Sequence, residues 1–121
     1  MADYKYSNDH AWILVDGDTA KIGITPYAAE QLGDIVYVDL PEVGDTLSLG
    51  DVFTEVESSK TSSEVPSPVS GEIVAVNEEL DDEPEAINDD AYAAWIIEVQ
   101  LDDESEVDAL LDSDAYDAIC E

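Results

Sequence analysis

The chain has 121 residues, and its 32 Asp and Glu against three Lys and no Arg give a formal net charge of −29. This length fits one domain over residues 1–121 with a single core, and a hydrophobic content of 45% argues against a disordered chain. So few cations cannot replace the counterions of nucleic acid or of an anionic membrane, so we expect neither as a partner.

The composition also bears on location and on metals. The sequence has no apolar run near the roughly 18 residues of a membrane span and no hydrophobic signal region at its N-terminus, so we expect a cytoplasmic protein. The negative charge repels itself in dilute salt and is screened in molar salt, which suggests the salt-rich cytoplasm of a halophilic archaeon. One cysteine, Cys120, and one histidine, His10, cannot alone build a soft-metal site, so we predict no metal.

A β-hairpin is the first element that the chain predicts. Residues 12–15 are apolar, and residues 20–24 return as a second strand after a turn at Gly17, which stands between two Asp residues. His10 precedes the first strand. We interpret it as a structural residue packed near Trp12 rather than as a catalytic group.

A short helix is predicted next, over residues 27–32. Thr25 is typical of the N-cap position, and Pro26 suits the first helical position, where the missing backbone N–H would be unpaired in any case. Gly33 is expected to end the helix, because glycine tolerates the left-handed backbone that closes many helices.

A short sequence repeat begins at this glycine. Residues 33–39, Gly-Asp-Ile-Val-Tyr-Val-Asp, are similar to residues 71–77, Gly-Glu-Ile-Val-Ala-Val-Asn. Two copies are too few for a solenoid but fit a small β-domain made of two similar halves. We expect Tyr37, inside the first copy, to lie in the core.

A hairpin with a lysine at its tip is predicted between the two copies. Residues 52–58 alternate as a half-buried strand does, and the small polar residues 58–63 form a turn. Prolines in the following segment, 65–69, place it at a sheet edge. In so cation-poor a chain, Lys60 on this turn suggests an amine presented for covalent modification. The alternative is an ordinary surface lysine.

The last third is predicted as an acidic loop, a strand and two short helices. The loop covers residues 80–90, and the strand covers 92–101 with Trp95 in the core. Apolar residues at helical spacing indicate one helix over 104–111 and another around Tyr116. Short strands, frequent turns and peripheral helices together predict a mainly β sandwich or flattened barrel.

The lysine turn and its surroundings resemble the glycine cleavage system H protein family. Residues 57–63, Glu-Ser-Ser-Lys-Thr-Ser-Ser, and residues 67–73, Ser-Pro-Val-Ser-Gly-Glu-Ile, are similar to the lipoyl-attachment region of that family. The likeness covers nearly the whole chain and includes residues 23–25, 32–38, 40–44, 56–58, 76–77, Leu80, Pro84 and Asn88.

The resemblance implies a barrel-sandwich hybrid, the lipoyl-domain-like fold of two antiparallel sheets, with short peripheral helices that include a C-terminal one. It implies lipoate joined to Lys60 by an amide and a carrier with no catalysis of its own. The implied partners are glycine dehydrogenase (P protein, with pyridoxal phosphate), aminomethyltransferase (T protein, with tetrahydrofolate) and dihydrolipoyl dehydrogenase (L protein, with FAD and NAD). A lipoate ligase or octanoyl transferase would load the lysine.

Some residues depart from the family pattern. The run Asp9-His10-Ala11-Trp12 stands where the family often has Ser-His-Glu-Trp, and Glu64 stands where it commonly has Asp. In the family these positions are thought to hold the amine of the aminomethyl-lipoyl arm. Because a cationic amine favours a nearby carboxylate, we hypothesise that Asp9 and Glu64 share this contact; the alternative is two solvated acids.

Three other interpretations stay open on the sequence alone. Biotin carriers usually present Met-Lys-Met, whereas Ser59 and Thr61 flank the lysine here. A lipoyl domain of a 2-oxoacid dehydrogenase would normally be shorter and joined to further domains. A scaffold or relay protein on the same fold could leave Lys60 idle or pass lipoate onward.

Overall fold

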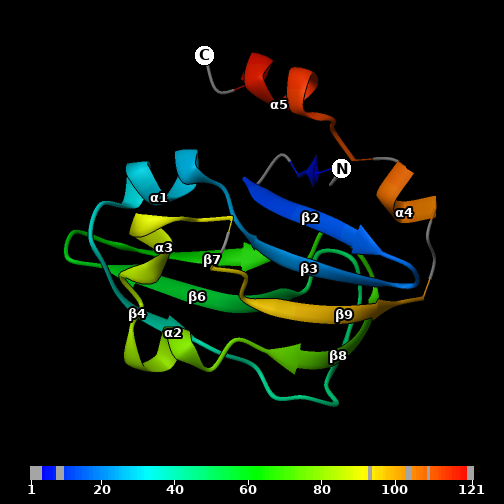
Figure 1. The fold of residues 1–121 in the computed structure, drawn as a ribbon, viewed down its shortest axis with the longest axis horizontal. Helices are drawn as coiled ribbons and strands as arrows, with labels where there is room; N and C mark the ends of the chain where they lie inside the picture. The colour runs from blue at the N-terminus through cyan, green and yellow to red at the C-terminus, as the bar shows by residue number, and fades with distance from the viewer. Residues whose placement is uncertain (1–3, 8–9, 93, 103–104, 109, 120–121) are drawn as a thin grey trace.

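Two antiparallel sheets form the body of the computed structural model, which describes residues 4–7, 10–92, 94–102, 105–108 and 110–119 (Figure 1). The larger sheet has the strand order β1-β2-β3-β9-β8-β5, and the smaller has the order β4-β6-β7. The strands are β1 (Tyr4–Tyr6), β2 (Ala11–Asp16), β3 (Thr19–Ile24), β4 (Ile35–Asp39), β5 (Thr46–Leu47), β6 (Val52–Ser58), β7 (Ser62–Pro66), β8 (Gly71–Val76) and β9 (Ile97–Leu101).

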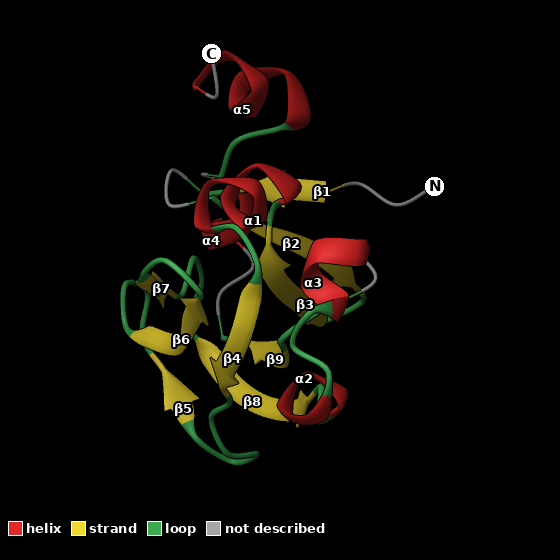
Figure 2. Cartoon of the chain, turned by 90° about the vertical axis from the view of Figure 1, so that its left-hand side faces the viewer, coloured by secondary structure: helices red, strands yellow, loops and turns green. Residues whose placement is uncertain are grey.

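Short helices surround the sheets. In Figures 1 and 2, α1, α2 and α3 gather at the end of the molecule that holds the β6–β7 turn, and α5 lies beyond β1. Within the described ranges, none of the helices has the length and apolar character needed to cross a membrane. The helices are α1 (Pro26–Leu32), α2 (Glu79–Asp82), α3 (Ala86–Asp89), α4 (Ser105–Asp108) and α5 (Ser113–Ile119).

The core lies between the two sheets, because alternate residues of both turn inward. Ile13 and Ile22 of the larger sheet are fully buried, and Val38 and Val56 of the smaller sheet meet them in one cluster. The predicted burial of Tyr37 is wrong: it is 44% exposed, because it neighbours the inward-facing Val38 and so points to the outer face. The expected fold class, mainly β with two antiparallel sheets and short helices, is confirmed.

The predicted first hairpin and first helix are also confirmed. β2 and β3 pair through a turn at Gly17, whose φ of 68° lies in the left-handed region. At the start of α1, Thr25 Oγ1 accepts the backbone N–H of Ala28 at 3.2 Å. Gly33 ends the helix with a φ of 89°.

The sequence repeat has a structural counterpart. Each copy carries a β-bulge at the same position, since the strand register shifts between Ile35 and Tyr37 in β4 and between Ile73 and Ala75 in β8. The two copies lie in different sheets, β4 in the smaller and β8 in the larger. The repeat therefore places one similar, bulged strand in each sheet.

The segment expected as an acidic loop over 80–90 instead contains the two short helices α2 and α3. Leu80 of α2 is 0% exposed and Ile87 of α3 is 1% exposed. Burial of these two side chains in the main core stabilises the two single-turn helices. The sequence did not predict them, because the acidic residues around Leu80 and Ile87 show no helical periodicity of apolar residues.

The strand expected over 92–101 begins only at Ile97. Before it, side chains bind two of the backbone carbonyls. Trp12 Nε1 donates to the Ala91 carbonyl at 3.1 Å, and Asn77 Nδ2 donates to the Trp95 carbonyl at 2.8 Å. These bonds satisfy polar groups of an irregular backbone. Trp95 is half-buried there, whereas the sequence predicted a core residue.

The C-terminal segment crosses back over the N-terminal strand. The helix predicted over 104–111 is limited to α4, and Leu111 instead bridges Tyr6, with both N–H···O=C distances at 2.8 Å. Asp112 Oδ1 then accepts the backbone N–H of Ala115 at 2.8 Å and caps α5, the helix predicted around Tyr116. Cys120 lies outside the described residues.

Candidate functional site

A tight turn at the end of β6 and β7 presents Lys60 to solvent, at the end of the molecule that faces the viewer in Figure 2. The Ser58 N–H donates to the Thr61 carbonyl at 2.7 Å, and Ser58 Oγ donates to the same carbonyl at 2.9 Å. Ser58 Oγ also accepts the backbone N–H groups of Lys60 and Thr61, at 3.2 and 3.0 Å. One serine therefore holds the turn closed, and the lysine lies at its tip as predicted.

The turn is fastened to the rest of the molecule through the segment that follows α1. The Ser59 N–H donates to the Asp34 carbonyl at 3.0 Å. The Lys60 side chain lies over Gly33, where an added Cβ would stand 2.7 Å from Lys60 Cε and 3.3 Å from Nζ. A side chain at position 33 would therefore displace the flexible end of the lysine from the place that it occupies here.

Asn88 of α3 clamps the same segment from the other side. Its Oδ1 accepts the Ile35 N–H at 2.8 Å, and its Nδ2 donates to the Gly33 carbonyl at 2.8 Å. This support was not predicted from the local sequence, because Asn88 is 53 positions from Ile35. Its only signal in the sequence was the match to the family pattern.

Glu64 lies on β7 and is exposed. In register it faces Glu55 of β6, which in turn faces Asp39 of β4, so three carboxylates cross the smaller sheet in one row. Asp9 lies outside the described residues, so its contact with Glu64 stays a prediction. Ala11 is 0% exposed within β2 and carries no group that could bind an amine.

His10 contacts α5 and α1. Its Nδ1 lies 2.7 Å from the Tyr116 hydroxyl of α5, and its ring contacts Tyr27 with centroids 4.8 Å apart. The same Tyr116 hydroxyl is 2.6 Å from Oγ1 of the buried Thr25. His10 therefore belongs to a polar contact that holds α5 against the start of α1, which supports a structural role.

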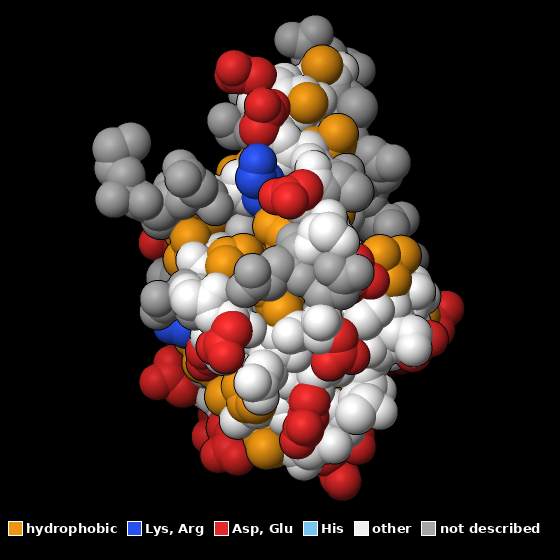
Figure 3. Space-filling view, turned by 90° about the vertical axis from the view of Figure 1, so that its right-hand side faces the viewer, with side chains coloured by type: hydrophobic (Ala, Val, Ile, Leu, Met, Phe, Trp, Pro, Cys, Tyr) orange, Lys and Arg blue, Asp and Glu red, His pale blue; other side chains and the backbone are white. Residues whose placement is uncertain are grey.

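The described part of the chain shows no cluster of metal-binding side chains. Its His, Cys, Asp and Glu residues form no group of three or more that could hold a metal ion. Figure 3 shows the face opposite the lysine turn, where acidic side chains are scattered among apolar ones rather than gathered around a cleft.

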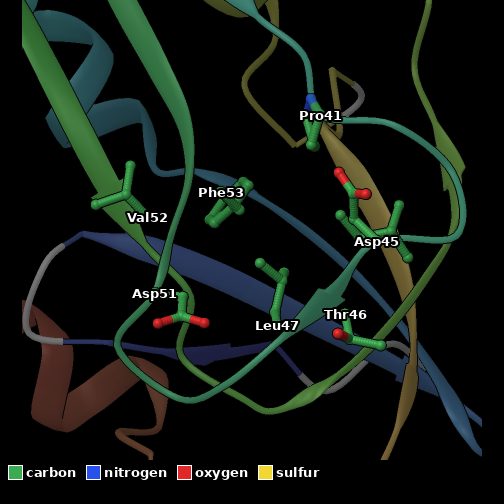
Figure 4. Close-up of a pocket in the computed structure, with 8 residues that line it drawn as sticks. Pro41, Asp45, Thr46, Leu47, Asp51, Val52 and Phe53 are labelled. Carbon is green, nitrogen blue, oxygen red and sulfur yellow. The ribbon is translucent and has the colours of Figure 1, made fainter.

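An open hollow of about 480 Å³ lies at the far end of β6 from the lysine (Figure 4). Asp45 and Asp51 are the acidic residues of its lining, and Val52 and Phe53 mark the beginning of β6 there. Because the hollow lies at the opposite end of this strand, it does not form a site around Lys60.

Comparison with known proteins agrees with this geometry. The family model described as Glycine cleavage H-protein matches residues 4–121. A glycine cleavage system H protein of Acidobacterium capsulatum is 51% identical over 117 residues, which are 97% of this chain and 91% of that protein. The corresponding protein of Staphylococcus haemolyticus is 53% identical over 116 residues, 95% of this chain and 92% of that one.

A solved structure supports the same conclusion. The crystal structure of a glycine cleavage system H protein from Mycobacterium marinum matches with a TM-score of 0.87 and 43% identity, covering 96% of this chain and 94% of that one. The expected barrel-sandwich fold is thus shared with a solved member of the family. The chain therefore belongs to the glycine cleavage H-protein family.

Proposed function

We propose that Lys60 carries lipoate in amide linkage and that the single domain over residues 1–121 is a carrier without catalytic activity of its own. Family membership makes the chain the carrier component of the glycine cleavage system. The observation that carries the assignment to Lys60 is an exposed lysine at the tip of a turn held by Ser58 and fastened to Asp34. A hydrogen-bonded turn beneath a long, exposed side chain suits an amine that must enter another enzyme's active site.

The residues present fit a lipoyl group. Small polar residues flank the lysine, so an acyl chain on Nζ would meet no bulky neighbour in the turn. When attached, lipoate supplies a disulfide that accepts the aminomethyl group of glycine and is left as a dithiol after that group departs. The protein itself anchors the lipoyl arm. Tethering raises the effective concentration of the arm's disulfide at the active site of each partner.

The partners follow from this role. We propose that the arm visits the P protein, which decarboxylates glycine, the T protein, which passes the one-carbon unit to tetrahydrofolate, and the L protein, which restores the disulfide with FAD and NAD. A lipoate ligase or octanoyl transferase loads Lys60. We place this cycle in the cytoplasm.

Intact-mass spectrometry of the protein from its native host tests the assignment, together with Lys60→Arg. We expect one lipoyl mass on the wild type and none on Lys60→Arg, with loss of glycine cleavage in a reconstituted system. Lys21→Arg, which changes a lysine of β3 near the Trp95 ring, is the matched control and should stay lipoylated. A biotinyl mass would identify a biotin carrier, and an unmodified native protein would identify a scaffold.

We further propose that Asp9 and Glu64 contact the cationic amine on the loaded arm. Glu64 is exposed at the middle of β7, the strand that follows the lysine turn. In the variant Asp9→Asn with Glu64→Gln, hydrolytic loss of the aminomethyl group should be faster than in the wild type. An unchanged rate would show that both residues are merely solvated.

A further inference from the structure

The bulge in β4 turns two consecutive apolar side chains toward solvent. Regular alternation would place one of any two neighbours inside, but Val36 is 54% exposed and Tyr37 is 44% exposed. On either side of them, Ile35 is 3% exposed and Val38 is 1% exposed. The bulge thus exposes Val36 and Tyr37 together, while the residues on either side of the pair stay in the core.

This pair lies beside the lysine turn. In the register of β4 with β6, Ile35 faces Ser58 and Tyr37 faces Glu57, so the bulged Val36 stands level with the last two residues before the turn. The Ser59 N–H is bonded to the carbonyl of Asp34, which fastens the turn to the same strand. A protein that approaches the Lys60 amine over β4 therefore contacts Val36 and Tyr37.

The same outer face is acidic. Glu57 stands opposite Tyr37, and the next outward row holds Asp39, Glu55 and Glu64 in register. In the part of the chain that the structure describes, Lys60 is the only cation at this end, since Lys5 and Lys21 lie on β1 and β3. A partner covering this face therefore meets an apolar pair bordered by carboxylates.

The short length of the unmodified lysine side chain indicates which enzyme must contact this face. Before modification the amine stands on a four-carbon stem, so the enzyme that forms the amide must press its own surface against the turn and its neighbours. Lipoate lengthens this stem, so an enzyme that acts on the disulfide at its end can stand farther from the backbone than the attaching enzyme. We propose that Val36 and Tyr37 are the docking contact for the lipoate-attaching enzyme, which meets them with an apolar socket bordered by Lys or Arg.

This inference rests on the proposed function, and the chain supplies a matched control. Val74 is the bulged residue of the second repeat and is 40% exposed, but it lies on β8 in the other sheet and is followed by Ala75 rather than a tyrosine. If exposure of Val36 were only a consequence of the bulge, Val36→Ser and Val74→Ser would behave alike.

The test measures attachment of lipoate to the purified apo-protein by a lipoate ligase with ATP, followed by intact mass. We expect Val36→Ser with Tyr37→Ser to lower kcat/KM by about tenfold, mainly through KM, because an apolar hot spot is removed. Val36→Ser alone should show the same direction, and Val74→Ser should match the wild type. KM should rise as salt is added, over a range in which circular dichroism shows an unchanged fold.

Equal kcat/KM for Val36→Ser and Val74→Ser would overturn the docking contact while leaving the proposed function intact. The docking contact is also overturned if the double variant is lipoylated normally and only decarboxylation by the P protein slows. A KM that falls as salt is added would overturn the cationic border of the socket. If the wild type gains no lipoyl mass at Lys60, the proposed function fails, and this inference fails with it.

Discussion

Gly33 is the residue on which three local features depend at once. It ends α1, its carbonyl accepts a bond from Asn88, and its missing side chain leaves room for the stem of Lys60. Its φ of 89° and ψ of −147° lie in a region that is open almost only to glycine. The residue that shapes the base of the lysine is therefore 27 positions away from it in sequence.

Gly33→Ala should cost about 1–3 kcal/mol of unfolding free energy, because it forces an L side chain into this backbone region. It should also slow acylation of Lys60, since the new Cβ displaces the lysine stem. Urea unfolding and the rate of lipoate attachment measure the two effects. Gly50→Ala is the control: its φ is 93°, but an added Cβ would meet nothing within 4 Å. If both variants lose attachment equally, the contact with the lysine is irrelevant.

At the scale of elements, aromatic contacts tie the chain ends to the sheets. Tyr6 of β1 stacks on Tyr116 of α5 with centroids 4.6 Å apart, and its hydroxyl lies 2.9 Å from that of Tyr92. Trp12 of β2 meets Tyr4 edge-on at 5.5 Å. These contacts form a second small core outside the sandwich, so β1 and α5 depend on each other for burial.

Tyr92 makes this second core sensitive to alkali. Burial raises the pKa of Tyr92 above its usual value, and the hydrogen bond with Tyr6 raises it further. Because the folded protein holds this proton more tightly than the unfolded chain, the stabilisation is complete below the unfolded pKa of about 10 and is lost as the pH rises above it.

Tyr92→Phe should therefore cost about 0.5–1.5 kcal/mol at pH 8, where the bond to Tyr6 is lost, and should weaken the decline of stability above pH 10. Urea unfolding of both proteins at intervals from pH 8 to pH 11 measures both effects. A decline as steep in Tyr92→Phe as in the wild type would show that Tyr92 is not the group responsible.

At the scale of the whole molecule, the charge of −29 is the dominant electrostatic feature. The row of Asp39, Glu55 and Glu64 shows that it acts locally too, since like charges directly opposite each other in a sheet are destabilising. We propose that the protein works in concentrated salt, as in a halophilic archaeon, where this repulsion is screened.

Unfolding free energy should rise steeply between about 0.1 and 1 M potassium chloride, as the Debye length shrinks from about 10 to 3 Å. Glu55→Gln should stabilise the protein at low salt by about 0.2–1 kcal/mol and lose that advantage at high salt. Glu72→Gln is the control, because Glu72 faces the uncharged Thr46 and Gln100. Equal effects of the two substitutions, or stability independent of salt, would contradict the screening account.

Local signals were sufficient for much of the fold. The Thr25 cap, the Gly33 stop and the alternating strands around Lys60 each depend on residues that are neighbours in the chain, and all three are confirmed. The repeat, interpreted as two similar halves, corresponds to one similar bulged strand in each sheet, and the sheets themselves differ in size. The position of the lysine at a turn was predictable for the same reason, because turn chemistry is read from adjacent residues.

Tertiary contacts decided the rest. The acidic stretch became helical because Leu80 and Ile87 are buried by distant partners, and the last strand was shortened by bonds from Trp12 and Asn77. The outward turn of Tyr37 depends on a bulge, which is a feature of pairing between two strands. By itself the sequence determined which residues form the lysine turn and the sheets around it. Only the tertiary structure decided what supports and surrounds that turn, because those contacts join residues far apart in the chain.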